Sequence, residues 1–195
     1  MRNAQIKRKT GETDITVALS LDGTGVSKIN TGCPFLDHML TLFSKHSRID
    51  LEVFAVGDTE VDYHHTTEDV GISLGIALRT ALGDMKGIRR YGDRVIPMDE
   101  TLVMSAIDIS GRAHLEFCAD IPSARVGGFD TELCEEFFRA FVRKAEITLH
   151  VRQLAGTNSH HIIEGIFKSV ARSLGDAISI DGRFACDVPS TKGVI

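Results

Sequence analysis

Two stretches of the chain repeat one arrangement of histidine and glutamate. In each, a glutamate stands three residues after a pair of histidines, first as His64, His65 and Glu68 and again as His160, His161 and Glu164. Apolar residues at helical spacing follow both stretches, so we expect each to begin a helix. Residues three and four apart share one face of a helix, which places each glutamate within reach of both preceding histidines. Imidazole with carboxylate suits a borderline divalent cation such as manganese, iron or zinc, and the pattern predicts a metal site.

The recurrence of the pattern favours a metal site over two unrelated surface histidine pairs. The two rings of a pair diverge by about 100° on a helix with about 3.6 residues per turn, so they need not bind the same ion. The two stretches could meet at one site or be completed by neighbouring subunits, and the spacing leaves both arrangements open.

The composition is typical of a soluble globular protein, with 43% hydrophobic and 25% charged residues in a chain of 195. A net charge of −5 and a pI near 5.9 argue against a general affinity for nucleic acid or an anionic membrane. No apolar run approaches the roughly 18 residues that span a bilayer, and the first residues lead into no signal peptide, so we expect a cytoplasmic protein. The four cysteines form no CxxC motif, which favours reduced, mostly buried thiols over disulfides.

Alternating apolar residues predict strands, and apolar stripes at helical spacing predict the helices between them. The strands are expected over 4–10, 12–21, 26–29 and 49–55. Pro34 suits the first turn of the helix that follows the third strand, and His38 lies on that helix. We expect Asp62 to cap the next helix, which carries the first histidine pair.

The same order of elements begins again in the second half of the chain. Glu100 and the strand after it match Glu12 and its strand at an offset of 88, a later strand recurs at 98, and the histidine pairs recur at 96. Three nearly equal offsets indicate a duplicated unit of about 95 residues. We expect one α+β domain over 1–195, made of two β-β-β-α-β-α repeats at about 1–92 and 93–195, with helices packed between two sheets.

Five segments carry a resemblance that covers nearly the whole chain. They are LDGTG at 21–25, PFLDHML at 34–40, HHTTED at 64–69, NSHHIIE at 158–164 and PSTKGV at 189–194. In this order they resemble the imidazoleglycerol-phosphate dehydratase family of histidine biosynthesis. The resemblance implies a duplicated unit similar to the second domain of ribosomal protein S5. It also implies a hydro-lyase that converts imidazole glycerol phosphate to imidazole acetol phosphate.

The resemblance further implies two Mn²⁺ ions per active site, with other divalent transition metals as alternatives. The expected ligands are His38, His64, His65, Glu68, Glu136, His160, His161 and Glu164. Glu136 stands where many family members have histidine, and Tyr63 where an acidic residue is common; a carboxylate at 136 still suits Mn²⁺. We expect each histidine stretch to be completed by a ligand from the preceding helix, His38 in the first half and Glu136 in the second.

The substrate, a small phosphorylated imidazole, requires a cationic subsite and a group that moves protons. By resemblance the phosphate is bound by Arg90, Arg112, Ser190, Thr191 and Lys192. Glu12 is expected to bind the substrate and to shuttle protons at its carbon chain as the catalytic acid–base group. The sequence alone would make each of these a solvated surface residue, and it indicates no role for Glu100.

The chemistry is demanding because the carbon that loses a proton is not acidic. A metal ion on a ring nitrogen would favour loss of the ring N–H proton, and the metal-bound imidazolate would expel hydroxide through a diazafulvene-like intermediate. The resemblance implies a homo-oligomer, a 24-subunit octahedral shell with active sites at subunit interfaces. Two other functions stay open at this point: a dinuclear hydrolase of phosphate esters, and a non-enzymatic assembly protein whose histidines bind metal between subunits.

Overall fold

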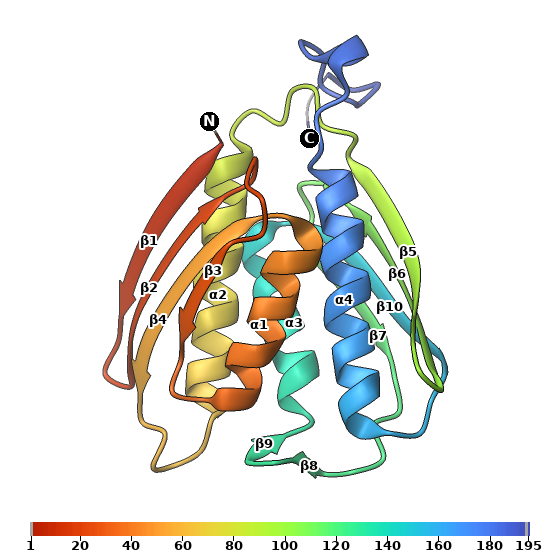
Figure 1. Ribbon diagram of the computed structural model, residues 1–195. Coiled ribbons are helices and arrows are strands. Elements are labelled where there is room, and N and C mark those ends of the chain that lie inside the picture. The colour runs from red at the N-terminus through yellow and green to blue at the C-terminus, as the bar shows by residue number, and fades with distance from the viewer. Residues whose placement is uncertain (1, 194) are drawn as a thin grey trace.

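Two four-stranded sheets face each other across a layer of helices in the computed structural model of the chain (Figure 1). The structure describes residues 2–193 and 195. The two termini lie at the same end of the helices. The prediction of an α+β fold with helices packed between two sheets is confirmed.

The first half of the chain forms one sheet and two helices. In chain order these are β1 (Asn3–Lys9), β2 (Thr13–Ser20), β3 (Ser27–Asn30), α1 (Pro34–Ser47), β4 (Asp50–Gly57) and α2 (His64–Leu82). The strands lie in the order β1-β2-β4-β3. Buried and half-buried residues alternate along β2, because Ile15, Val17 and Leu19 point from the sheet into the core. The N-cap residue of α2 is Tyr63 and not Asp62 as expected, but Asp62 Oδ1 accepts the His64 N–H at 2.7 Å and so satisfies a donor of the first turn.

The second half repeats this order with additions. Its matching elements are β5 (Tyr91–Met98), β6 (Thr101–Asp108), β7 (His114–Cys118), α3 (Leu133–Ala145), β10 (Thr148–Ala155) and α4 (Ser159–Ala177). The strand order β5-β6-β10-β7 equals that of the first sheet. A hairpin of β8 (Arg125–Val126) and β9 (Phe129–Asp130) and the 3₁₀ helix η1 (Gly182–Phe184) were not expected from the sequence.

The helices pair across the two halves. α2 packs on α3, and α1 packs on α4. Two glycines let the first pair approach closely: a Cβ atom at Gly71 would lie 2.7 Å from the Phe137 carbonyl oxygen, and one at Gly75 would lie 2.5 Å from that of Phe141. Phe43 of α1 meets Phe141 edge-on with ring centroids 6.1 Å apart. This packing brings the N-terminal ends of all four helices to one end of the molecule (Figure 1).

The four cysteines divide equally between the core and the surface. All four cysteines are free; Cys33 and Cys134 are buried, whereas Cys118 and Cys186 are exposed. The expectation that most of the thiols are buried therefore holds for only two of them. Over the described part of the chain, no helix has the length and apolarity needed to cross a membrane.

Candidate metal and substrate site

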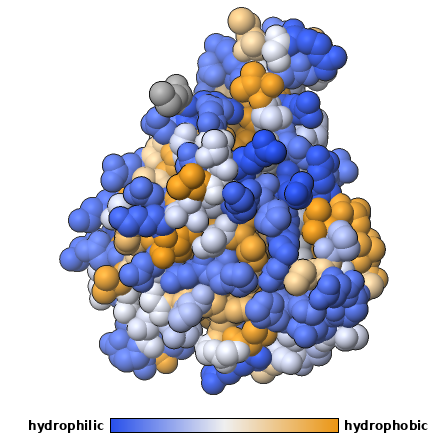
Figure 2. Space-filling view, in the orientation of Figure 1, coloured by the Kyte–Doolittle hydropathy of each residue, from blue (hydrophilic) through white to orange (hydrophobic). Residues whose placement is uncertain are grey.

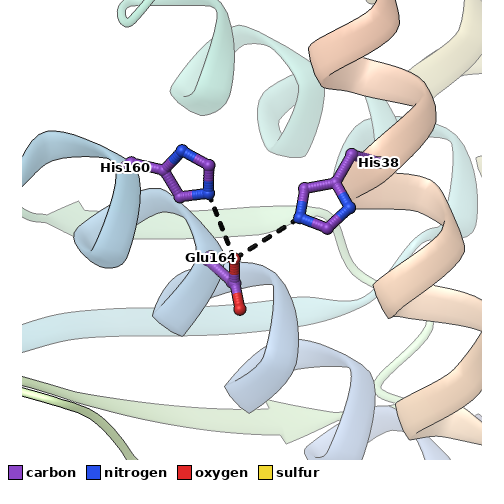
Figure 3. A group of neighbouring side chains, drawn as sticks. All are labelled: His38, His160 and Glu164. Carbon is purple, nitrogen blue, oxygen red and sulfur yellow. Dashed lines mark hydrogen bonds and ion pairs between the residues drawn. The ribbon is translucent and has the colours of Figure 1, made fainter.

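The N-terminal turns of α1 and α4 bring His38, His160 and Glu164 together (Figure 3). One ligand atom of each lies within 4.8 Å of the others. Glu164 Oε2 is 3.2 Å from His160 Nε2 and 3.5 Å from His38 Nε2. Asn158 fixes the start of α4, because its side chain accepts the backbone N–H groups of His160 and His161. We call these three residues the first cluster; their donor atoms converge on one point.

Glu164 is the buried member of the first cluster. Its side chain is 9% exposed, and Oε1 pairs with Lys168 Nζ at 2.5 Å, which leaves Oε2 to face the two imidazoles. Burial by itself raises the pKa of Glu164, but the hydrogen bond and charge of Lys168 and the bonds with His160 and His38 outweigh it. The pKa is thus held below its ordinary value. The ionised carboxylate is ready to bind a cation.

A second cluster of the same design lies between α2 and α3. His64, Glu68 and Glu136 each place one ligand atom within 4.8 Å of the others. Arg143 Nη2 lies 3.2 Å from Glu68 Oε1, so a cationic side chain flanks this cluster as Lys168 flanks the first. The second cluster has two carboxylates and one imidazole, the reverse of the first.

Both clusters join the two halves of the chain, which corrects one prediction. We expected His38 to complete the first histidine stretch and Glu136 to complete the second. Instead, α1 lies against α4 and α2 against α3, so His38 meets the second stretch and Glu136 meets the first. The composition of each cluster follows the packing of the helices and not their order in the sequence.

The second histidine of each pair points away from its cluster. His65 Nδ1 lies 2.9 Å from Asp58 Oδ2, and His161 Nδ1 lies 2.8 Å from Glu100 Oε2. Each cluster glutamate therefore faces only the first histidine of its pair, and the expectation that it reaches both was wrong. Consecutive positions on a helix diverge too far for one carboxylate to serve both. A carboxylate on Nδ1 orients the ring and presents Nε2 as the metal-binding atom.

Asp58 and Glu100 are site residues that the sequence did not reveal. The hydrogen bond with Asp58 raises the pKa of His65, and that with Glu100 raises the pKa of His161. The same bond with His161, followed by the backbone N–H of Asn158, lowers the pKa of Glu100 to about 2. The available signals were that Asp58 lies six residues before the first histidine helix and that Glu100 is the repeat partner of Glu12. Exposed carboxylates are too common for either signal to identify a site residue.

Glu12 lies on the turn between β1 and β2, at the end of the molecule that holds the clusters. Its Oε1 is 3.8 Å from His65 Nε2, and its side chain is 55% exposed. Thr10 Oγ1 accepts the backbone N–H of Glu12 at 3.1 Å. A free carboxylate beside a candidate metal ligand is suited to exchange protons with a bound molecule.

The expected phosphate-binding residues share one pocket of about 540 Å³. It is lined by Arg90, Arg112, Ser190, Thr191 and Lys192, with Tyr91, Ser110, Gly111 and Ile195. Arg90 is fixed by Asp108, with Nε 2.7 Å from Oδ1, and it donates to the Pro189 carbonyl at 2.9 Å. The hydrogen bond with Asp108 raises the pKa of Arg90. Arg112 donates to the Ser110 carbonyl at 3.1 Å. Forked and single cationic donors in one pocket suit a phosphate group.

The clusters and this pocket lie at opposite ends of the helices. His160 is in the first turn of α4. The backbone N–H of Arg90, in contrast, donates to the carbonyl of Ala177, the last residue of that helix, at 2.9 Å. A helix of 19 residues is roughly 28 Å long at about 1.5 Å per residue. One copy of the chain therefore does not bring all the predicted site residues into one place.

The donor sets of both clusters fit a divalent transition-metal ion. Each combines imidazole nitrogen with carboxylate oxygen, the mixture that borderline cations accept. The hydrogen-bonded carboxylates behind His65 and His161 are the kind of support that metal-binding histidines require. Within the described residues, these two clusters are the groups of three or more side chains arranged to hold an ion.

Comparisons of sequence and of structure relate the chain to a single enzyme family. The profile of a family described as imidazoleglycerol-phosphate dehydratase matches residues 31–174. A protein of that name from Rhodopseudomonas palustris (strain TIE-1) is 60% identical over 193 residues, which cover 99% of this chain and 98% of the relative. One from Trichodesmium erythraeum (strain IMS101) is 57% identical over 195 residues, which cover 100% of this chain and 92% of the relative.

Two solved structures of enzymes with this name share the fold. The one from Staphylococcus aureus has a TM-score of 0.84 at 46% identity and covers 92% of this chain and 99% of its own. The one from Pyrococcus furiosus has a TM-score of 0.84 at 36% identity and covers 97% of this chain and 100% of its own. These matches extend over both repeats. The chain therefore belongs to the imidazoleglycerol-phosphate dehydratase family, the hydro-lyases of histidine biosynthesis.

Proposed function

We propose that the chain dehydrates imidazole glycerol phosphate to imidazole acetol phosphate in a metal-dependent reaction, with two Mn²⁺ ions per active site. The observation that carries the proposal is the pair of crossed clusters, in which side chains far apart in the sequence face one another. Each cluster would hold one ion. The oriented Nε2 atoms of His65 and His161 would complete the ligand set.

The metal supplies what acid–base side chains lack. Bound to a ring nitrogen of the substrate, it would act as a Lewis acid and favour loss of the ring N–H proton. The chain's own part is to hold that ring. Buried Glu164 and the first histidine of each pair fix the ring end of the site, and Phe35, edge-on to His160 at 5.3 Å between centroids, forms an apolar wall beside it.

Glu12 would serve the carbon chain of the substrate. Its carboxylate is exposed, lies on a turn tied by Thr10, and is 3.8 Å from His65 Nε2. A group at this position can take the proton from the carbon adjacent to the one that loses its hydroxyl, and can deliver a proton to the ring-adjacent carbon when the enol becomes the ketone. Proton transfer by a positioned carboxylate contributes about 10²–10⁴ in rate.

The phosphate pocket would fix the other end of the substrate. Arg90 is already held by Asp108, so its guanidinium is aimed before the ligand arrives. Arg112 and the loop of Ser190, Thr191 and Lys192 add donors around the same volume. Binding energy at the phosphate then holds the carbon chain against the proton-transfer group.

The separation of the two ends supports a homo-oligomeric active site. The substrate has three carbons between ring and phosphate, and at roughly 1.5 Å per bond it cannot bridge the roughly 28 Å along α4. We therefore infer that the cluster end of one copy meets the phosphate pocket of another. A 24-subunit octahedral shell is the assembly that we expect from the family resemblance.

Metal removal and restoration test this function. Purified protein is analysed for metals, stripped with a chelator, reloaded with Mn²⁺ and assayed for keto product from imidazole glycerol phosphate. We expect about two Mn²⁺ per chain in the active protein, no turnover after stripping and recovery on reloading. Full activity in protein that contains no transition metal would contradict the proposal.

The same assay separates the two rival functions. A dinuclear hydrolase would release inorganic phosphate from the substrate and leave no keto product. A non-enzymatic assembly protein would change size on stripping but show no turnover at any metal loading. The proposed dehydratase keeps the phosphate on its product.

A further inference from the structure

A buried polar network ties the turn that carries Glu12 to α2. Asp69, which directly follows cluster residue Glu68, is 7% exposed. Its Oδ2 accepts a hydrogen bond from Thr13 Oγ1 at 2.5 Å and pairs with Arg8 Nη1 at 2.5 Å. One carboxylate therefore binds both strands of the β1–β2 hairpin to the helix that bears His64 and Glu68.

The network continues into the backbone of the turn. Thr10 Oγ1 accepts the N–H groups of Glu12 at 3.1 Å and Thr13 at 3.0 Å. The Thr10 N–H donates to the Thr13 carbonyl at 2.8 Å, which closes the turn. Glu12 is thus one residue from an anchored position, although its own side chain projects into solvent.

The second half of the chain lacks this network. At the repeat offsets of 88 and 96, Arg8, Thr13 and Asp69 correspond to Ile96, Thr101 and Gly165. A Cβ atom at Gly165 would lie 3.5 Å from Thr101 Cγ2, so the same helix and strand positions still face each other.

The difference between the two halves indicates that the fold does not require the network. The same strand and helix pack together in the second half, where Ile96 and Gly165 replace the ion pair of Arg8 and Asp69. The Arg8–Asp69 ion pair is moreover a weak source of stability, because Arg8 is only half-buried and the desolvation of Asp69 offsets the attraction between the charges. The ionic version occurs in the half whose turn carries the proposed proton-transfer group.

We propose that Asp69, together with Arg8 and Thr13, is a positioning group that fixes Glu12 relative to the metal cluster on α2. The inference rests on the proposed role of Glu12. A hairpin turn without this anchor would move relative to the helix, and misplacement of a reacting group by about 1 Å can cost about 10²-fold in rate. Asp69 touches no reacting atom and acts only through the turn.

Removal of the Thr13 hydroxyl tests the anchor. Thr13→Val keeps the shape of the side chain but removes the donor to Asp69, and we expect kcat to fall about 10–100-fold with KM within about twofold. Thr13→Ser keeps the donor and should stay within about threefold of wild-type kcat. Ser105→Ala is the matched control, because Ser105 Oγ bonds Ser173 Oγ at 2.7 Å and so joins a strand to a helix in the other half. It should lose stability without losing kcat.

A double variant shows whether the loss passes through Glu12. If Thr13 acts by placing Glu12, Glu12→Gln/Thr13→Val should be no more than about twofold slower than Glu12→Gln alone. Wild-type kcat in Thr13→Val beside an inactive Glu12→Gln would overturn the inference alone, as would additive losses in the double variant or an equal loss in Ser105→Ala. Wild-type kcat in Glu12→Gln would instead overturn the proposed role of Glu12, and the inference with it.

Discussion

Glu12 and Glu100 occupy the same point of the two repeats, yet their surroundings differ. Glu12 is exposed, and its nearest charged partner is His65 Nε2 at 3.8 Å. Glu100 is engaged by His161 Nδ1 at 2.8 Å and by the N–H of Asn158 at 2.9 Å. In the first half, Asp58 makes the contact with the histidine ring. The turn carboxylate of the first half, Glu12, is therefore not bonded to a histidine Nδ1, and it is the one that we propose for proton transfer.

The two clusters differ in a related way. The first has two imidazoles and a buried glutamate, whereas the second has one imidazole and two carboxylates, Glu68 and Glu136. Their positions are related by the repeat, but their charges are not. We expect the second cluster to prefer a harder cation than the first, because oxygen ligands favour harder ions.

The largest effect on turnover is expected from substitution of the histidines in the two clusters. If the clusters are crossed, His38→Ala/His160→Ala damages one of them, and His38→Ala/His64→Ala damages both. The first double variant should retain about one Mn²⁺ per chain and the second close to none, and both should lose all measurable turnover. Elemental analysis of purified protein checks this. The reverse result, with about one Mn²⁺ per chain in His38→Ala/His64→Ala and close to none in His38→Ala/His160→Ala, would mean that each half of the chain completes its own cluster.

The next largest effect is a difference in kcat between variants of the two turn carboxylates, Glu12 and Glu100. Glu12→Gln should lower kcat by about 10²–10⁴-fold at unchanged Mn²⁺ content, because it removes the proton-transfer group. Glu100→Gln is the matched change in the other half and should lose much less at saturating Mn²⁺. Steady-state kinetics with metal analysis measures both. Equal losses in kcat would erase the distinction between the halves.

A smaller effect is expected in metal affinity. Asp58→Asn and Glu100→Gln each weaken the support of a histidine ring, and such changes cost about 10–100-fold in metal affinity. Competition with a fluorescent chelator gives the Mn²⁺ dissociation constant of each variant. The two variants should lose similar affinity, since Asp58 and Glu100 contact their histidine rings at nearly the same distance. An unchanged affinity in either variant would show that its histidine does not bind metal.

The smallest effect is a change in stability with pH. In metal-free protein, the pKa of Glu100 is lowered from 4.5 to about 2, chiefly by His161. A carboxylate with a lower pKa in the folded state stabilises the protein above its ordinary pKa and loses that contribution as pH falls towards the folded value. The excess Tm of wild type over Glu100→Gln should therefore be present at pH 5 and shrink towards pH 2. Thermal unfolding with chelator present measures it, and a constant difference would contradict the assignment.

Local periodicity made most of the fold predictable. Alternation in the strands and the proline at the start of α1 act through neighbouring residues, so they can be seen in the sequence. The repeat offsets then gave the order of the second half. The hairpin of β8 and β9 was missed because strands of two residues carry no periodic signal.

The sequence identified the six residues of the two clusters, but not which of them lie together. Which helix packs on which is decided by close approach in space, as where a Cβ atom at Gly175 of α4 would lie 2.7 Å from the Ser47 carbonyl oxygen of α1. Spacing could not show that His38 belongs with the second histidine stretch. It also could not tell Glu100 from Glu12, because their neighbours come from other segments.

The most direct test of the account is complementation between two inactive variants. Glu12→Gln disables the cluster end of the chain, and Arg112→Ala disables the phosphate pocket at the other end. Co-expression with two different tags and purification through both yields mixed oligomers. If active sites form between copies, random pairing should restore roughly a quarter of wild-type turnover. Mixed oligomers as inactive as either parent would contradict the claim that the two ends of different copies form one site.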